Sequence, residues 1–348
     1  MIRLKPVTLK RIKRFKSIKR GYYSFVFLMI LIGLSLVAEL YINSKALMVR
    51  YEGNTYFPIF ADVYPGKTFG LDYEYETNYR KLREKFKEEG SDNKVYMPLI
   101  EFNAFENDFR EGEYPPTAPS WEDGHYLGTD STGRDVLARL IYGFRTAIAF
   151  SVILLLVNYV IGISIGCLMG FVGGWFDLFF QRIIEIWSNV PFLYIVIIIS
   201  SIMIPNFTVL IGIMAFFGWM NMTWYMRTAT YKEKAREYVM AAKSLGASKT
   251  RIIFNHILPN SVSIIVTFIP FAIAGGIMAL TALDYLGFGL PAPTPSWGEL
   301  LRQGQKYLDA KWISVSVVVF MVLILMMVTF VGEAVREAFD PKKHTTYE

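Results

Sequence analysis

Few side chains in this sequence are suited to catalysis or to metal binding. The three histidines are His125, His256 and His344, and the single cysteine is Cys167. They are far apart in the sequence, whereas metal sites and nucleophile–base pairs are usually signalled by ligands at short, regular spacing. Cys167 also lies in an apolar run, where a lone cysteine packs as a small hydrophobic residue. We therefore expect no catalytic residue, metal ion or cofactor on this chain.

The segment Gly246-Ala247-Ser248-Lys249-Thr250 faintly suggests a phosphate-binding loop. That motif needs a lysine followed directly by Ser or Thr, after a glycine-spaced run that leaves a strand. Here Ser248 precedes Lys249, and the flanking pattern is helical. A turn between two helices is the better interpretation, and ATP hydrolysis by this chain is not expected.

This turn lies in a predicted helix–turn–helix. The first helix should cover 233–245, with Ala241 and Ala242 leaving a shallow surface that another protein could approach closely. Gly246 suits a left-handed C-cap. A second helix should begin after Ser248, a suitable N-cap, and stop near Pro259. The pattern predicts a rigid knob on which a soluble partner docks.

The elements that must position this knob are membrane-spanning helices. The chain of 348 residues is 53% hydrophobic and 19% charged, whereas a soluble protein carries about 25% charge. Apolar runs of 18 or more residues can cross a hydrocarbon core of about 30 Å. The first run extends from Tyr22 to Ile42. Further spans are predicted near 146–171, 178–203, 207–227, 263–287 and 313–335.

The basic residues indicate how these spans are oriented. Nine Lys and Arg residues and no acid lie in the first twenty positions, directly before the first span. The loop 228–262 is also more basic than acidic. Both features place these segments in the cytoplasm by the positive-inside rule. The net charge of +6 therefore reflects membrane orientation, and we expect no nucleic-acid partner.

The predicted topology divides the chain into five parts. They are a cytoplasmic basic N-terminus (1–21), a first transmembrane helix (22–42), an extracytoplasmic insertion (43–144), a five-helix core (145–335) with the cytoplasmic loop 228–262, and a cytoplasmic C-terminus (336–348). The insertion has enough aromatic and apolar residues to bury a modest core, and a short charged helix is expected over Lys81 to Glu89.

Glycines and prolines give further structural expectations for the spans. Gly162, Gly166 and Gly170 share one helix face, which permits close approach of a neighbouring helix. Pro191 and Pro270 fall inside predicted spans and should kink them, because each removes a backbone hydrogen bond.

Two acidic residues near the spans, Glu185 and Asp284, are functional candidates because intramembrane carboxylates often are. Structural roles are favoured for both. Glu185 can pair with Arg182 at (i, i+3) spacing, and Asp284 can be hydrated at the membrane interface.

The predicted knob resembles the conserved cytoplasmic loop of binding-protein-dependent ABC importer permeases. That loop reads E-A-A, three residues, G, nine residues, I, one residue, L-P. Met240 departs from the usual Glu, and His256 replaces the usual Ile, as it does in the peptide-transporting branch. The resemblance assigns ATPase coupling to Glu237, Ala241, Ala242, Gly246, Ala247, Leu258 and Pro259.

Two other segments resemble the dipeptide/oligopeptide/nickel permeases of the same family. Residues 127–143, which begin Leu-Gly-Thr-Asp-Ser-Thr-Gly-Arg-Asp, are similar to the element before the second helix in those proteins. Residues 283–298, which begin Leu-Asp-Tyr-Leu-Gly-Phe-Gly-Leu-Pro, are similar to the loop after the fifth helix. The terminal Phe339-Asp340-Pro341 also fits. Within the family, the long insertion with Tyr56-Phe57-Pro58 is similar to that of microcin C importer permeases.

The resemblance implies an all-α, six-helix type I ABC importer permease fold with a large periplasmic insertion after the first helix. It implies a location in the bacterial inner membrane, surrounded by lipid, with both termini cytoplasmic. The implied partners are a second homologous permease, two ATPase domains that bind ATP and Mg, and a periplasmic peptide-binding protein. The implied cargo is oligopeptides or microcin C-like peptides.

Two other classes of membrane protein agree less well with the sequence. An ion-driven secondary transporter of small solutes would favour mid-membrane charges and inverted repeats, and neither is clear in the sequence. A membrane enzyme would need a clustered nucleophile and base or a metal set, and the scattered histidines with Cys167 provide none.

Overall fold

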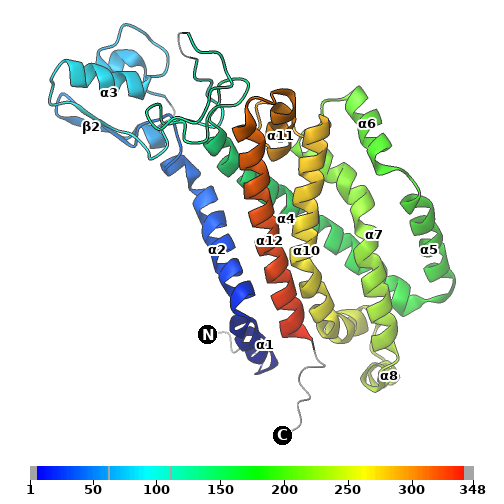
Figure 1. The fold of residues 1–348 in the computed structure, drawn as a ribbon. Coiled ribbons are helices and arrows are strands. Elements are labelled where there is room, and N and C mark those ends of the chain that lie inside the picture. Colours follow the sequence, from blue (N-terminus) through cyan, green and yellow to red (C-terminus); the bar gives the residue numbers. More distant parts are fainter. Residues whose placement is uncertain (1–5, 62, 110–111, 341–348) are drawn as a thin grey trace.

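The computed structural model describes residues 6–61, 63–109 and 112–340, which are mostly helical (Figure 1). The predictions made for Arg3 and Lys5 in the basic N-terminus, and for Pro341 and His344, lie outside the described residues. The same is true of the remainder of the C-terminal segment after position 340.

Within the described ranges, five helices are long and apolar enough to cross a membrane. They are α2 (Lys19–Leu36), α4 (Val136–Val172), α7 (Phe207–Lys234), a continuous helix Lys249–Leu286 that contains α10 (Leu258–Leu286), and α12 (Lys311–Phe339). A bent pair, α5 (Gly174–Ser188) and α6 (Phe192–Ile202), makes a sixth span if it is counted as one. The expected helical membrane fold is confirmed.

The span expected over 178–203 is broken rather than kinked. Helices α5 and α6 meet at an angle of 69°. Pro191 caps the start of α6 with extended backbone dihedrals. A proline there cannot donate a helical hydrogen bond and disfavours helical geometry at the preceding residue, so the chain leaves the first helix before it. Pro270 differs, because it stays inside α10.

Two helix boundaries differ from those expected. The first span was expected to reach Ile42, but α2 ends at Leu36 and a 3₁₀ turn (Ala38–Leu40) follows. Helix α4 begins at Val136 instead of near 146, because the Asp135 side chain caps it. That side chain accepts a 2.7 Å hydrogen bond from the Ala138 N–H. The first turns of α4 therefore belong to a polar segment that hydropathy alone does not detect.

The insertion folds around a small antiparallel sheet. Its strands are β1 (Met48–Tyr51), β2 (Asn54–Tyr56) and β3 (Lys94–Tyr96), in the order β2-β1-β3. The 3₁₀ turns Pro58–Phe60 and Gly66–Phe69 follow β2. The expected charged helix is α3 (Tyr79–Glu88). The core between sheet and helix contains Ala46, Val49, Phe69, Tyr79, Leu82 and Phe86.

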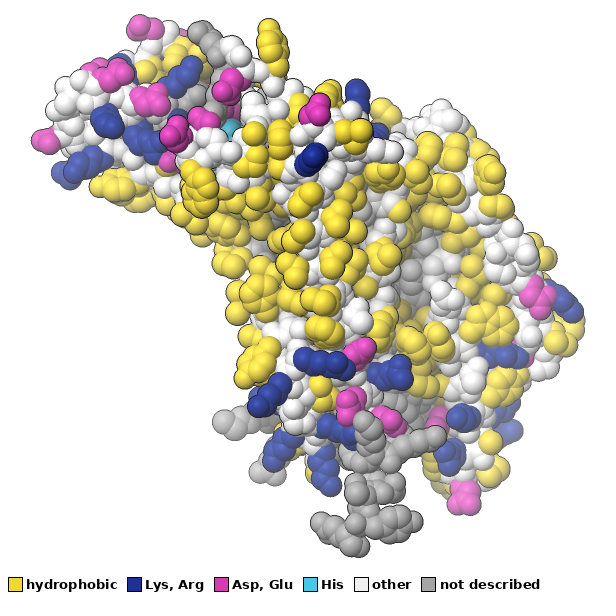
Figure 2. Space-filling model, viewed as in Figure 1, with side chains coloured by type: hydrophobic (Ala, Val, Ile, Leu, Met, Phe, Trp, Pro, Cys, Tyr) yellow, Lys and Arg dark blue, Asp and Glu magenta, His cyan; other side chains and the backbone are white. Residues whose placement is uncertain are grey.

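The bundle has two chemically different ends. The insertion lies at one end, and α1 (Pro6–Ser17), α8 (Glu237–Ser244) and the last turns of α12 lie at the other (Figure 1). Figure 2 shows hydrophobic side chains over the middle of the bundle, Lys and Arg side chains at the α1 end, and mixed basic and acidic side chains on the insertion. This distribution agrees with the positive-inside expectation for the α1 and α8 end.

The helices α4 and α7 pack with almost no space between their backbones. A Cβ atom added to Gly162, Gly166 or Gly170 would lie 2.5–2.7 Å from a carbonyl oxygen of α7. The oxygens belong to Trp219, Thr223 and Arg227 respectively. The predicted glycine face is confirmed, and α7 is the helix that it contacts.

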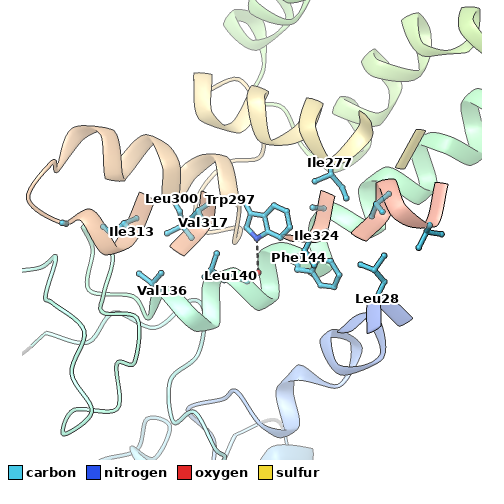
Figure 3. Packing of buried hydrophobic residues seen from close by; sticks show 14 residues of the cluster. Leu28, Val136, Leu140, Phe144, Ile277, Trp297, Leu300, Ile313, Val317 and Ile324 are labelled. Carbon is cyan, nitrogen blue, oxygen red and sulfur yellow. Dashed lines mark hydrogen bonds between the residues drawn. The ribbon is translucent and has the colours of Figure 1, made fainter. Parts of the chain in front are cut away.

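At the insertion end, α11 (Trp297–Lys306) inserts its first residue into the bundle. Trp297 lies among buried residues of α4, α10 and α12, including Phe144, Ile277 and Val317 (Figure 3). Its Nε1–H donates a 3.0 Å hydrogen bond to the carbonyl oxygen of Leu140. This bond satisfies the indole, so the ring can be fully buried.

The close contact predicts different effects for two Gly→Ala substitutions. Gly166→Ala should destabilise the protein by about 1–3 kcal/mol, because its Cβ must push α7 away. Gly212→Ala, on α7 itself, should be neutral or slightly stabilising, because no atom lies within 4 Å of the added Cβ. Thermal unfolding in mild detergent measures both. Equal midpoints for the two variants would contradict the proposed packing constraint.

Candidate functional site

The predicted knob is present and its turn is well defined, but its first helix begins at Glu237 and not at 233, because α7 continues to Lys234. Helix α8 ends at Ser244, and Gly246 follows with φ +79°. The Ala247 N–H donates to the Ala242 carbonyl and the Gly246 N–H donates to the Lys243 carbonyl, both at 3.0 Å. These two bonds form a Schellman motif. The motif fixes the direction in which the chain leaves α8.

The second helix of the knob does not stop at Pro259, which corrects the sequence prediction. Ser248 caps α9 (Lys249–Ile252) as expected, a π-helical turn (Ile253–Ile257) follows, and α10 begins at Leu258. The proline occupies the first turn of α10, where a missing N–H is tolerated. A π turn, with hydrogen bonds wider than those of an α-helix, ends at Ile257, two residues before Pro259. The knob is therefore continuous with a membrane-spanning helix.

The seven residues to which the resemblance assigns ATPase coupling divide into two groups. Ala242, Ala247 and Leu258 pack against a cluster that contains Val239 and Ile257. The residues that face outward are Glu237, Ala241, Gly246 and Pro259. The shallow surface predicted for both alanines is therefore wrong for Ala242, which faces inward because helical neighbours one residue apart point in different directions.

The most exposed large apolar side chain of the knob was missed from the sequence. Leu245 is 88% exposed at the tip of the turn, and Met240 is 52% exposed on α8. Leu245 therefore exposes an apolar side chain to solvent at the tip of the turn. The position of Leu245 in the sequence could have indicated this exposure, because it comes directly before the capping glycine, where the chain turns away from its own core.

A pocket of about 330 Å³ lies beside this tip. Met240 of α8 and Phe171 of α4 contribute to its apolar wall, and Lys234, Lys243 and Lys249 also line it. The arrangement suits a partner surface that presents an apolar side chain together with acidic groups.

At the insertion end, the segment 127–143 meets the segment 283–298, where Arg139 donates to the Pro293 carbonyl at 3.3 Å, and also Glu299 directly after that segment. Arg134 donates to Asp130 at 2.7 Å and to Glu299 at 2.7 Å. Arg139 pairs with the other oxygen of Glu299, and its Nε lies 3.5 Å from Asp130. Asp130 and Arg139 are both 0% exposed. This charge cluster joins the start of α4 to α11.

Neighbouring charges favour the ionised forms of Asp130 and Arg134. Burial by itself raises the pKa of Asp130, but the Arg134 and Arg139 guanidiniums outweigh it and hold the pKa below its usual value. Burial lowers the pKa of Arg134, and Asp130 with Glu299 reverses this effect and raises it. Gln303 donates to Glu299 at 3.0 Å and accepts from the Ser131 N–H at 2.9 Å, so further lone pairs are satisfied.

A buried histidine adjoins the charge cluster. The Nδ1 atom of His125 lies 2.8 Å from Asp135, and its Nε2 atom lies 3.2 Å from Asp108. Burial lowers the pKa of His125, but the two carboxylates outweigh it, and the pKa is raised. Both ring nitrogens can donate to a carboxylate only when the imidazole is protonated. His125 therefore connects the insertion to the Asp135 cap of α4.

The structure gives Glu185 and Asp284 structural contacts. Arg182 donates to Glu185 at 2.5 Å, as predicted. Asp284 is only 5% exposed, so its expected hydration is wrong. It accepts from the Leu290 N–H at 2.6 Å and from the Ser296 hydroxyl, and it thereby folds the loop between α10 and α11.

Sequence comparison places these features in a known family. Residues 162–345 match the family described as "Binding-protein-dependent transport system inner membrane component". The chain is 40% identical over 343 residues to the inner membrane ABC transporter permease YejE of Escherichia coli K12, covering 99% of each. It is 38% identical over 362 residues to the peptidoglycan transport permease YejE of Agrobacterium fabrum, covering 97% of this chain and 94% of that one. It is 34% identical over 228 residues to the oligopeptide permease OppC of Lactococcus lactis, covering 64% of this chain and 77% of that one.

The charge cluster predicts a large effect for Arg139→Gln. Removal of one cation leaves the buried carboxylates of Glu299 and Asp130 with too little neighbouring positive charge. This should lower the free energy of unfolding by about 3–5 kcal/mol. The matched variant is Arg83→Gln, which breaks an Arg–Glu101 pair whose arginine is 43% exposed and should cost at most about 1 kcal/mol. Unfolding midpoints in detergent compare the two, and a similar loss in both would show that burial of the cluster is unimportant.

The raised pKa of His125 predicts that the free energy of unfolding decreases as pH rises. Because its folded-state pKa is raised, the protonated ring stabilises the fold fully below about pH 6.5, and this contribution is lost as pH rises through the folded-state pKa. Unfolding midpoints between about pH 6 and pH 9 should fall for the native chain and be flatter for His125→Gln. The same slope in both proteins would contradict this role.

Proposed function

Because this chain belongs to the family of binding-protein-dependent transport system inner membrane components, we propose that it is a permease subunit of an ATP-driven importer of oligopeptides. The observation that carries the proposal is the knob around Gly246. Its tip exposes Leu245, and the chain on either side continues through α7 and α10 into the membrane. A contact at the tip is therefore mechanically connected to two spanning helices.

The proposed partners follow from the two ends of the molecule. ATPase subunits, which bind ATP and Mg, dock on α8 and its pocket, and this chain itself does not hydrolyse ATP. A second, homologous permease completes the pathway, and a periplasmic peptide-binding protein delivers cargo at the insertion end. In this arrangement α1, α8 and the end of α12 are cytoplasmic, in the inner membrane of a bacterium, which the basic residues of α1 support.

The proposed cargo class is supported by the relatives. One full-length relative carries peptidoglycan transport in its name, and a partial relative carries oligopeptide transport. The long insertion adds the resemblance to microcin C importer permeases. Oligopeptides, with microcin C-like peptides among them, are the proposed cargo. Uptake of a labelled oligopeptide, of a microcin C-like peptide and of a peptidoglycan fragment would rank the three.

An ion-driven secondary transporter is the alternative function. It would need no ATPase partner, so co-purification of the chain with or without ATPase subunits distinguishes it from the proposal. No specific observation in the described residues favours it, and the family match weighs against it.

The proposal predicts that Leu245→Asp abolishes recovery of ATPase subunits with the chain in mild detergent. A carboxylate at an 88% exposed position should leave folding intact while placing an unpaired charge in the docking contact. Peptide uptake should fall at least about tenfold. The matched variant is Leu99→Asp, at a position that is 75% exposed in the insertion, and it should recover the ATPase normally.

The contrary result would be equal ATPase recovery and uptake with Leu245→Asp and with the native chain. Recovery of the native chain without any ATPase, under conditions that retain its unfolding midpoint, would favour the ion-driven alternative.

A further inference from the structure

A large apolar pocket lies between α1 and the bundle. Its volume is about 400 Å³, within the range of about 300–1,000 Å³ that is common for ligand sites. Helices α1, α2, α4, α10 and α12 line it, with Phe15, Val152, Pro270 and Phe339 among the contacts. It lies toward the end of the spans where α1 begins. The walls thus suit a hydrocarbon chain.

Charge is present at one side of this pocket. Among the described residues that line it, Arg11 alone is charged. Its guanidinium lies 4.6 Å from the ring centroid of Phe339, which holds the group near the apolar wall. A guanidinium in this position can bind a phosphate through paired N–H groups.

Helix α1 surrounds Arg11 with further positive charge. It carries five cations and no acid in twelve residues. Arg14 lies 3.8 Å from Glu337, whereas Lys10, Lys13 and Lys16 are exposed and make no ion pair within the described part of the chain. The nearby acids are on α12 and directly after it, at Glu333, Glu337 and Asp340. Cations exceed acids here, so an anion is favoured.

We propose that this pocket binds an anionic phospholipid of the leaflet on the α1 side. One acyl chain occupies the apolar pocket, and the phosphate lies against Arg11 in the field of the α1 lysines. A basic amphipathic helix at the membrane surface attracts anionic headgroups, and each Lys or Arg near the surface contributes about 1 kcal/mol. Selective binding requires both the apolar pocket and the cations of α1. A zwitterionic lipid fits the pocket, but the cations of α1 contribute little to its binding free energy.

The bound lipid would fix α1 to the bundle. Direct links between α1 and the end of α12 are the Arg14–Glu337 pair and the Arg11–Phe339 contact. An acyl chain would fill the remaining space between α1 and α10, which is the helix continuous with the knob. The lipid site depends only on the pocket and on α1, so it is independent of whether the chain imports peptides.

The test is native mass spectrometry of the full chain, alone and with its co-purified partners, after exchange into mild detergent with phosphatidylglycerol or phosphatidylcholine of the same acyl chains. The native chain should retain phosphatidylglycerol in preference to phosphatidylcholine. The variant K10Q/R11Q/K13Q should lose this preference by about tenfold or more. Its matched control is K81Q/K87Q/K94Q, which removes three exposed cations from the insertion.

A second variant tests the apolar half of the site. Val152→Trp should fill the pocket and reduce retention of both lipids, while Leu156→Trp, at an exposed position on the same helix outside the pocket, should not. Unchanged phosphatidylglycerol retention in K10Q/R11Q/K13Q, or an equal loss in the insertion control, would overturn the proposal. Loss of the lipid when the partner subunits are present would also overturn it, because a protein would then occupy the pocket.

Discussion

The close contact between the backbones of α4 and α7 is the constraint on which the rest of this structure depends. Apolar side chains gain little from one another in lipid, so helices in a membrane associate through close packing and polar contacts. Gly162, Gly166 and Gly170 provide such a contact over two turns, with α7 carbonyl oxygens where side chains would otherwise lie. A polar link joins α5 to α7, because Arg227 of α7 donates to Asp177 of α5 at 2.5 Å from its Nε and 2.7 Å from its Nη2.

This rigid pair connects the two ends of the molecule. The start of α4 holds Arg139 of the charge cluster, which joins it to α11 at the insertion end. The end of α7 leads directly to α8, and the Schellman turn at Gly246 returns the chain into the long helix that contains α10. In the proposed importer, a displacement of the knob by an ATPase would therefore move α7 and α10 together, and α4 would carry the movement to the insertion end.

The sequence was sufficient for features that depend on neighbouring residues. The apolar runs, the glycine face, the Ser248 cap and the left-handed Gly246 each follow from local physical preferences. The meeting of 127–143 with 283–298 could not be predicted, because one sequence does not show which distant charges pair. No role was therefore predicted for Arg134, Arg139 or Glu299, which form the charge cluster. The helix through Pro259 was missed because the local rule that a proline stops a helix does not hold in the first turn of α10, where a missing N–H is tolerated.

The central claim is that the tip of the knob contacts an ATPase subunit. Cysteine cross-linking in native membranes tests it directly, with Leu245→Cys in a Cys167→Ala background, since Cys167 is the single cysteine of the chain. The account predicts a cross-link from position 245 to an ATPase subunit, with a yield that changes when ATP is added. No cross-link from position 245, together with an ATPase cross-link from Leu99→Cys at the opposite end, would contradict it.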